Sequence, residues 1–220
     1  MAVLSIAWSS PGSVAPKEAK VVTPKEGEEA PKDEPAPVKR ADKPMFVCIT
    51  DPSATDTAAF DKLEKIILTE DKIVIGSKAF ACYRMTPENA AKDRLLASAG
   101  KEIPRIVLVS TDYENVTVLE GSKLSVADVW KAMEKEFRAT YKGELEKVSK
   151  GMLKVLQEFD KVGAALKVQE EKEQRADKPT AADKADWAKT RDELKERQKK
   201  AEKERDELLK FEKKAVKVAA

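Results

Sequence analysis

Between residues 44 and 137, short apolar runs alternate with segments whose apolar residues recur at helical spacing. A continuous apolar run such as 45–49 predicts a buried strand, because helices cover both faces of a central parallel strand. The pattern predicts strands at 45–49, 80–85, 105–109 and 116–119, and helices at 56–68, 71–75, 86–99 and from 126 onward. The order βαβαββα, with a hairpin near its end, predicts a mixed sheet in an α/β domain.

Residues with capping chemistry mark the predicted helix starts. Thr86, Pro87 and Glu88 supply an N-cap, a proline at the first helical position and a first-turn acid. Ser125 and the acid three residues later have the spacing of a capping box. Asp56 is interpreted as the cap of the helix at 56–68.

The last third of the chain carries an apolar seam with steps of alternately four and three residues, which is typical of a coiled coil. The seam consists of Tyr141, Leu145, Val148, Met152, Val155, Phe159, Val162 and Leu166. Upstream, Phe137, Met133 and Trp130 continue the stripe with a shift of phase. One unbroken helix is therefore expected from about 126 to 174.

A second helix follows the Pro179 segment, and Thr180 and Asp183 are its predicted capping pair. Its apolar positions lie seven apart, at Trp187, Leu194, Ala201, Leu208 and Ala215. One apolar position per heptad is too few for an independent coiled coil, so this helix is expected to fold back on the first as an antiparallel hairpin. Two roles stay open for a further apolar set, either hairpin core or a contact surface for a second copy or another protein. The set is Leu153, Leu156, Leu209 and Phe211.

Residues 1–42 contain little that can form a core. Residues 17–42 are rich in Pro, Glu, Lys and Ala, a composition typical of an extended linker. The apolar patch before them has three interpretations: a shortened export signal, a disordered tail, or a peptide that docks on a partner through Leu4, Ile6 and Trp8. The predicted organisation is a tail at 1–42, a domain at 43–137 and a helical arm at 138–220.

Charge limits the class of partner. The chain of 220 residues has 42 basic and 40 acidic side chains, a net charge of +2. This balance offers no electrostatic footprint for nucleic acid, and no apolar run is long enough to span a bilayer. The expected partners are proteins, including a second copy through the helical arm. A cytoplasmic location is favoured, with export as the alternative if residues 1–15 are a signal remnant.

The chain contains no histidine, which removes the commonest general base and metal ligand. Ser-His-Asp and Cys-His mechanisms, His-ligated zinc and haem are therefore excluded. The two cysteines, Cys48 and Cys82, cannot form a four-thiolate site, and no metal or cofactor is expected. They are either a disulfide pair or small buried side chains.

Three stretches resemble the thioredoxin-like superfamily over residues 43–137. KPMFVCIT and the later AAFDKLEKIIL are similar to the family's first strand and first helix, and EIPRIVLV is similar to its cis-proline loop. The resemblance implies a thioredoxin-like mixed sheet flanked by helices. It also implies that Pro104 is cis and faces the turn that carries the active-site motif. In this chain that turn is Ala54, Thr55, Asp56 and Thr57.

The chain departs from the family at its defining motif, because positions 54 and 57 are not cysteines. Dithiol exchange by the family's route is then unavailable to it. The main hypothesis is a non-catalytic interaction protein, with a redox-inactive head and a coiled-coil arm that mediates assembly of a complex. The alternatives are a thiol-redox enzyme or sensor that uses Cys48 or Cys82, and a peptide-binding, chaperone-like module whose groove lies beside Pro104.

Overall fold

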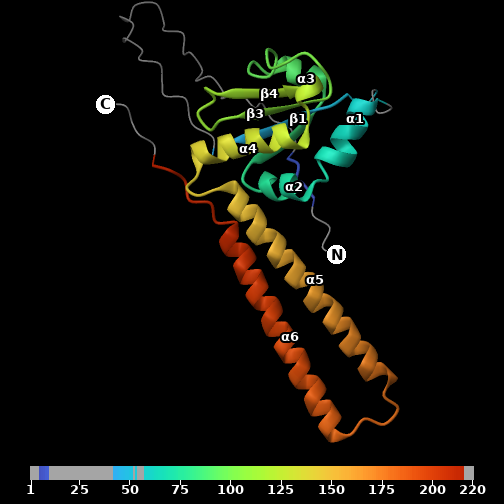
Figure 1. Cartoon of the computed structure of the whole chain (residues 1–220). Helices are drawn as coiled ribbons and strands as arrows, with labels where there is room; N and C mark the ends of the chain where they lie inside the picture. The colour runs from blue at the N-terminus through green and yellow to red at the C-terminus, as the bar shows by residue number, and fades with distance from the viewer. Residues whose placement is uncertain (1–4, 10–41, 52, 54–56, 216–220) are drawn as a thin grey trace, which may run out of the picture. The chain divides into compact units, whose positions relative to one another are not determined.

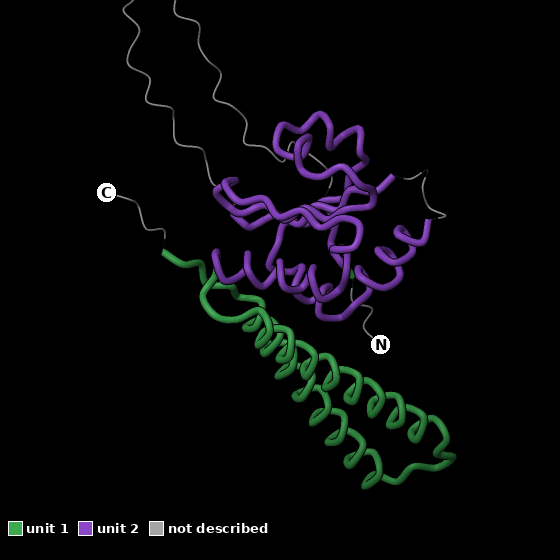
Figure 2. The backbone as a smooth tube through the Cα atoms, turned by 45° about the horizontal axis from the view of Figure 1, so that its top comes forward, with its two compact units in different colours: residues 1–5, 141–220 green, residues 6–140 purple. Residues whose placement is uncertain are grey.

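The computed structural model describes residues 5–9, 42–51, 53 and 57–215 (Figure 1). The chain divides into two compact units, of which the first, residues 6–140, is called here the α/β unit (Figure 2). The other, which contains residues 141–220, is called the hairpin unit. The boundary falls close to the predicted end of the domain at 137. Most of the predicted tail at 1–42 lies outside the described residues.

The α/β unit is built on a four-stranded mixed sheet with the order β2-β1-β3-β4. The strands are β1 (Met45–Ile49), β2 (Ala81–Met85), β3 (Arg105–Val109) and β4 (Val116–Glu120). β1 and β2 are parallel, whereas β3 is antiparallel to both β1 and β4. The predicted strands and the final hairpin are confirmed.

Helices cover both faces of this sheet, which is why every residue of β1 and β3 is buried. The helices of the unit are α1 (Ala58–Lys62), α2 (Asp71–Ser77), α3 (Pro87–Lys92) and α4 (Val126–Thr140). Figure 1 shows α3 on one face and α1, α2 and α4 on the other. On the α3 face, Met45, Val47 and Ile49 pack in one cluster with Ala90 and Leu96.

The first helix differs from its prediction at both ends. Thr57 is its N-cap, with a hydroxyl that accepts a hydrogen bond from the Phe60 N–H at 3.2 Å. The prediction that Asp56 is the cap was therefore wrong. After Lys62 the helix continues as a π-helical turn, Leu63–Ile67, that buries Leu63 and Ile67 in the core.

The helix predicted at 86–99 is also shorter than expected. Thr86 caps it as predicted, but α3 ends at Lys92. The Asp93 carboxylate then accepts hydrogen bonds from the backbone N–H groups of Leu95 and Leu96 at 3.0 and 3.3 Å. This side chain offers the backbone a partner outside the helix, so the chain turns and still buries Leu96 completely.

The prediction of one unbroken helix from 126 to 174 was wrong. α4 ends at Thr140 and α5 (Leu145–Arg175) begins after a short connection. Gly143, within this connection, has a φ of +93°, which glycine adopts without strain and which a continuous helix does not allow. The shift of phase between Phe137 and Tyr141 marks this break in the sequence.

The hairpin unit consists of α5 and α6 (Ala181–Leu208), which run antiparallel. Their direction follows from three contacts along their length: Gly151 with Leu208, Glu158 with Arg197, and Glu173 with Arg191. The predicted capping box of Thr180 and Asp183 is present, with both reciprocal hydrogen bonds. The helical hairpin is therefore confirmed. Of the helices that the structure describes, none has the length and apolar character to cross a membrane.

Candidate functional site

The residues that directly follow β1, Thr50 and Asp51, lie with the predicted proline at one edge of the sheet. Ile49, the last residue of β1, pairs with Arg105, the first of β3, so Pro104 lies beside the residues that follow β1. The Ile103–Pro104 peptide bond is cis, as the resemblance implied. The Thr50 N–H donates to the Met85 carbonyl at 3.1 Å, which places the end of β2 at the same edge.

The polar residues described at this edge act as caps. Ala54, Thr55 and Asp56 lie outside the described residues, and Thr57 caps α1. The Asp51 carboxylate accepts hydrogen bonds from the Ser53 hydroxyl at 2.6 Å and from its N–H at 2.8 Å. These hydrogen bonds hold the pKa of Asp51 below its ordinary value, so this carboxylate stays ionised. The Ser53 hydroxyl and the Asp51 carboxylate thus pair with each other inside the turn, and the Thr57 hydroxyl accepts from the backbone of α1.

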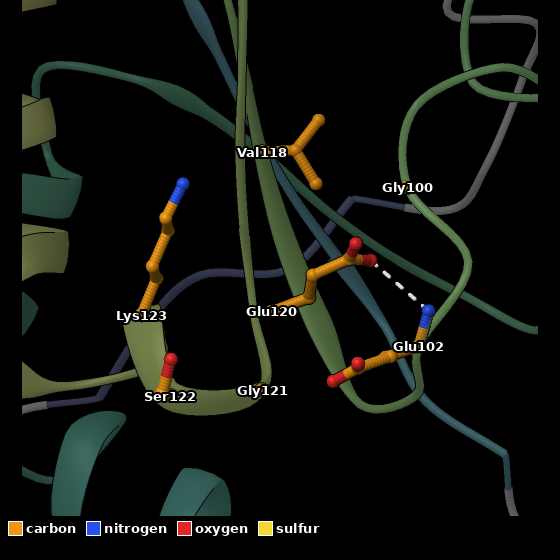
Figure 3. Close-up of a pocket in the computed structure, with 7 residues that line it drawn as sticks. All are labelled: Gly100, Glu102, Val118, Glu120, Gly121, Ser122 and Lys123. Atoms are coloured by element: carbon orange, nitrogen blue, oxygen red, sulfur yellow. Dashed lines mark hydrogen bonds between the residues drawn. The ribbon is translucent and has the colours of Figure 1, made fainter.

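The loop that carries Pro104 is held by a carboxylate from β4. One oxygen of Glu120 accepts from the backbone N–H groups of Lys101 and Glu102, at 2.8 and 3.0 Å (Figure 3). Gly100, with a φ of +83°, leaves room for this contact, because a Cβ there would collide with Glu120 and lie 2.7 Å from Val118. This arrangement presents Ile103 at the surface, where 37% of it is exposed.

A cavity of about 390 Å³ lies beside this loop. Its lining residues are Gly100, Glu102, Val118, Glu120, Gly121, Ser122 and Lys123 (Figure 3). Because two backbone N–H groups already occupy one oxygen of Glu120, the carboxylate has a structural role here. Within the described part of the chain, no group of three or more His, Cys, Asp or Glu residues could hold a metal ion.

The two cysteines lie on neighbouring strands, as expected, and both are free thiols. Cys48 pairs with Arg84 and Cys82 with Phe46, so the thiols share one face of the sheet but are offset along it. Both are buried, with 0% and 3% of their surfaces exposed. Burial raises the pKa of Cys48 to about 12 and that of Cys82 to about 11. Neither is a thiolate at neutral pH, which removes the nucleophile that exchange requires.

A buried carboxyl on α4 was missed from the sequence. Glu136 is only 2% exposed. Burial raises its pKa, and the negative charge of Asp112, in the turn between β3 and β4, adds to the effect. The adjacent Lys135 lowers that pKa only in part. Position 136 falls at helical spacing on the buried face of α4, seven residues after Val129 and three after Met133, but an argument that counts only apolar residues passes over an acid there.

The predicted seam is the core of the hairpin unit, with burial that varies along it. The buried members are Tyr141, Leu145, Met152, Val155, Val162 and Leu194. The half-buried members are Val148, Phe159, Leu166, Trp187 and Leu208. Leu153, Leu156, Leu209 and Phe211, which the sequence left between core and contact surface, are all half-buried.

The open end of the hairpin is closed by backbone and aromatic contacts. The rings of Tyr141 and Phe211 have centroids 5.4 Å apart. The Lys142 N–H donates to the Glu212 carbonyl at 2.8 Å, and the same two side chains form an ion pair at 3.0 Å. Tyr141 also forms a β-bridge with Lys213. The hairpin unit therefore holds its own two ends together, which the sequence pattern did not reveal.

One part of the predicted tail lies on the α/β unit. Ser9 forms a parallel β-bridge with Tyr83, and its N–H donates to the Cys82 carbonyl at 2.9 Å. Ile6 is 8% exposed, and the Trp8 ring lies 6.3 Å from that of Phe46. Residues 6–9 are thus docked on the sheet, which corrects their assignment to a free tail. Leu4, the third residue of the predicted docking peptide, lies outside the described residues.

Comparison of the chain with protein-family models, with curated proteins and with solved structures found no match. The thioredoxin-like assignment therefore stays a prediction that rests on the sequence resemblance.

Proposed function

We propose that this protein is a non-catalytic interaction protein, with a redox-inactive, thioredoxin-like α/β unit and a coiled-coil hairpin that mediates assembly of a protein complex. The observation that carries the proposal is the closed hairpin unit. Helices of 31 and 28 residues share a core, and Tyr141, Lys142 and their partners at 211–213 close its base. Such a hairpin presents two long helical surfaces without help from other elements.

The chemistry of the α/β unit supports the non-catalytic part of this proposal. The residues at positions 54 and 57 are Ala and Thr, and the two thiols lie inside the sheet with raised pKa values. The redox alternative needs an exposed thiolate with a lowered pKa, and both cysteines have the opposite environment. The polar groups described around Pro104 are used as caps or as supports of the loop.

Two exposed aliphatic residues offer a matched test in the full chain. Val168 on α5 is 53% exposed and Ile66, in the α/β unit, is 56% exposed. Tagged full-length chains that carry Val168→Glu or Ile66→Glu are purified from the native host, and the proteins retained with them are quantified by mass spectrometry. The proposal predicts that Val168→Glu loses proteins that the unaltered chain retains, whereas Ile66→Glu keeps them.

The reverse pattern would place recognition on the α/β unit and favour the peptide-binding alternative. Circular dichroism of both variants serves as the folding control. Because both residues are exposed, each substitution is expected to change the free energy of unfolding by less than about 0.5 kcal/mol.

A further inference from the structure

Residues 6–9 lie at the outer edge of β2, where Ser9 forms one parallel β-bridge with Tyr83. Ser9 pairs with Tyr83, so Trp8 lies on the opposite face, which carries Cys82 and Arg84, and its contacts with Arg84 and Phe46 agree with this placement. Ile6 is buried, Trp8 is half-buried, and Ala7 between them is exposed. The docked segment therefore uses one aliphatic and one aromatic anchor, two positions apart.

The anchor site of Trp8 is formed by residues of the sheet and of the helices beside it. Arg84 lies over the Trp8 ring, with its Cζ atom 4.9 Å from the ring centre. Glu64 fixes this guanidinium by accepting from its Nη2 at 2.7 and 2.9 Å. A cation held over an aromatic face is attractive, and more so where water is partly excluded. Glu64 and Arg84 pair with each other directly, without Trp8 between them.

The second contact of Trp8 is with Phe46, and the small side chain of Cys82 between them leaves room for it. By the strand register, Trp8 lies next to Cys82, and Cys82 lies next to Phe46 on β1. The rings of Trp8 and Phe46 thus meet across an intervening strand, which a bulkier residue at position 82 would prevent. The ring of Phe80 packs edge-on against that of Phe46, with centroids 6.5 Å apart, so Trp8, Phe46 and Phe80 form one aromatic cluster.

We propose that this edge of β2 is a peptide-binding site that residues 6–9 occupy in cis. It takes from a protein partner an extended segment that runs parallel to β2, with an aliphatic residue two positions before an aromatic one. Strand addition of this kind uses backbone hydrogen bonds for affinity and alternate side chains for specificity. Residues 6–9 show which side chains fit this site. Ile6 represents the aliphatic residue and Trp8 the aromatic residue expected in the partner segment.

Two observations make the segment displaceable. Its pairing with β2 is one isolated bridge, whereas each strand pair within the sheet has a register of five residue pairs. The sequence also places 32 residues, 10–41, between the segment and the start of the α/β fold. The effective concentration of a tethered ligand falls as its tether lengthens, so a partner segment competes more readily than it would with a short tether. This inference does not involve the hairpin unit, and its failure leaves the proposed function standing.

The test uses the full chain and a fluorescein-labelled peptide with the sequence of residues 5–9, SIAWS. Trp8→Ala weakens the segment in cis, and we expect this variant to bind the peptide about tenfold or more tightly than the unaltered chain does, measured by fluorescence anisotropy. Adding Arg84→Gln to Trp8→Ala removes the cation over the ring and should abolish that gain. A peptide with Ser in place of Trp is the matched control and should not bind.

A second variant keeps the test decisive if Trp8→Ala does not fold. Ser9→Pro removes the N–H that donates to the Cys82 carbonyl and leaves both anchors in place, so it should also raise peptide binding. The proposal is overturned if a folded variant fails to bind the peptide. It is equally overturned if both substitutions unfold the α/β unit, because residues 6–9 are then an integral strand.

Discussion

Cys48 and Cys82 are the only cysteines of the chain, and their positions decide whether it has thiol chemistry. Both lie within strands, on the face of the sheet opposite to Met45, Val47 and Ile49, which pack with Ala90 of α3. The positive charge of Arg84 lowers the pKa of Cys48, but burial has the larger effect and the net shift is upward. A neighbouring cation therefore does not make a thiolate here, because the thiol is cut off from solvent.

We predict that iodoacetamide labels the native protein at pH 8 at least about a hundredfold more slowly than it labels a free cysteine, because only the thiolate reacts. Mass spectrometry of the intact protein over time measures the rate. The same protein in guanidinium chloride is the control and should take two labels quickly. Rapid labelling of either cysteine in the native protein would restore the redox alternative.

Glu136 gives a prediction about pH. Its pKa in the folded chain is raised, so the unfolded chain loses the proton first as the pH rises. The ionised carboxylate then lowers the free energy of unfolding at neutral pH. Glu136→Gln should remove this cost, so the variant should be more stable than the unaltered chain at pH 7. The gain should disappear as the pH falls below the pKa of the unfolded carboxyl, where both states are protonated.

Urea unfolding curves at pH 7 and pH 3.5 measure this difference. Glu134→Gln is the matched control, because Glu134 lies two residues earlier on α4, is partly exposed and pairs with Arg138 at 3.8 Å. This control should show no gain at pH 7. A loss of stability in Glu136→Gln at pH 7 would show that the ionised carboxylate is favourable in the fold.

Local chemistry predicted some of these residue roles and could not predict others. Thr86 as a cap followed from its neighbours Pro87 and Glu88, and the cis Pro104 followed from the resemblance. The role of Cys82 as a spacer between Trp8 and Phe46 depends on three segments that are far apart in the sequence. No local pattern can report such a contact.

At the scale of elements, the approach of α6 to α5 depends on a glycine. A Cβ built on Gly151 would lie 2.9 Å from Cδ2 of Leu208, whereas a Cβ on Gly163, in the same helix, meets nothing within 4 Å. Replacing a helical glycine with alanine normally stabilises the helix by about 1 kcal/mol. Alanine at position 163 therefore tests helix propensity alone, whereas alanine at position 151 also tests the packing against Leu208.

We predict that Gly163→Ala raises the free energy of unfolding by about 1 kcal/mol, and that Gly151→Ala raises it less. Gly151→Leu should lower it by about 1–3 kcal/mol, because the larger side chain forces Leu208 away. Thermal unfolding followed by circular dichroism compares the variants. Equal gains from alanine at both positions would contradict the close packing at Gly151.

The apolar periodicity predicted the helical hairpin well, because the seam at Leu145, Met152 and Val155 is buried as a core must be. It did not predict the end of α4 at Thr140. A hydrophobic pattern with a shift of phase is compatible with both a bend and a break, and here the conformation of Gly143 selects the break. Buried polar residues such as Ser149 and Gln169 also escaped the pattern, because a periodicity argument counts apolar residues only.

For the whole molecule, the sequence predicted three parts and the structure resolves two compact units with similar boundaries. The main difference lies in residues 6–9, which belong to the α/β unit although a Pro- and Glu-rich segment separates them from it in sequence. Composition assigned them to the tail, but a segment with one β-bridge and two anchors needs only an accessible sheet edge to dock on. Function was harder to predict from the sequence than the fold. The proposed function depends on which proteins bind the surface of the hairpin unit, and the sequence pattern does not identify them.

The most direct test of the account is cross-linking of the full chain with a lysine-reactive reagent in extracts of its native host, followed by mass spectrometry of links to other proteins. Exposed lysines occur on both units, so the α/β unit is an internal control. The hairpin set is Lys154, Lys161, Lys195 and Lys199, and the α/β set is Lys62, Lys65, Lys92 and Lys131. If the hairpin unit mediates assembly, links to a reproducible set of proteins should concentrate on the hairpin lysines. Links confined to the α/β lysines, or equal links from both sets to unrelated proteins, would contradict the account.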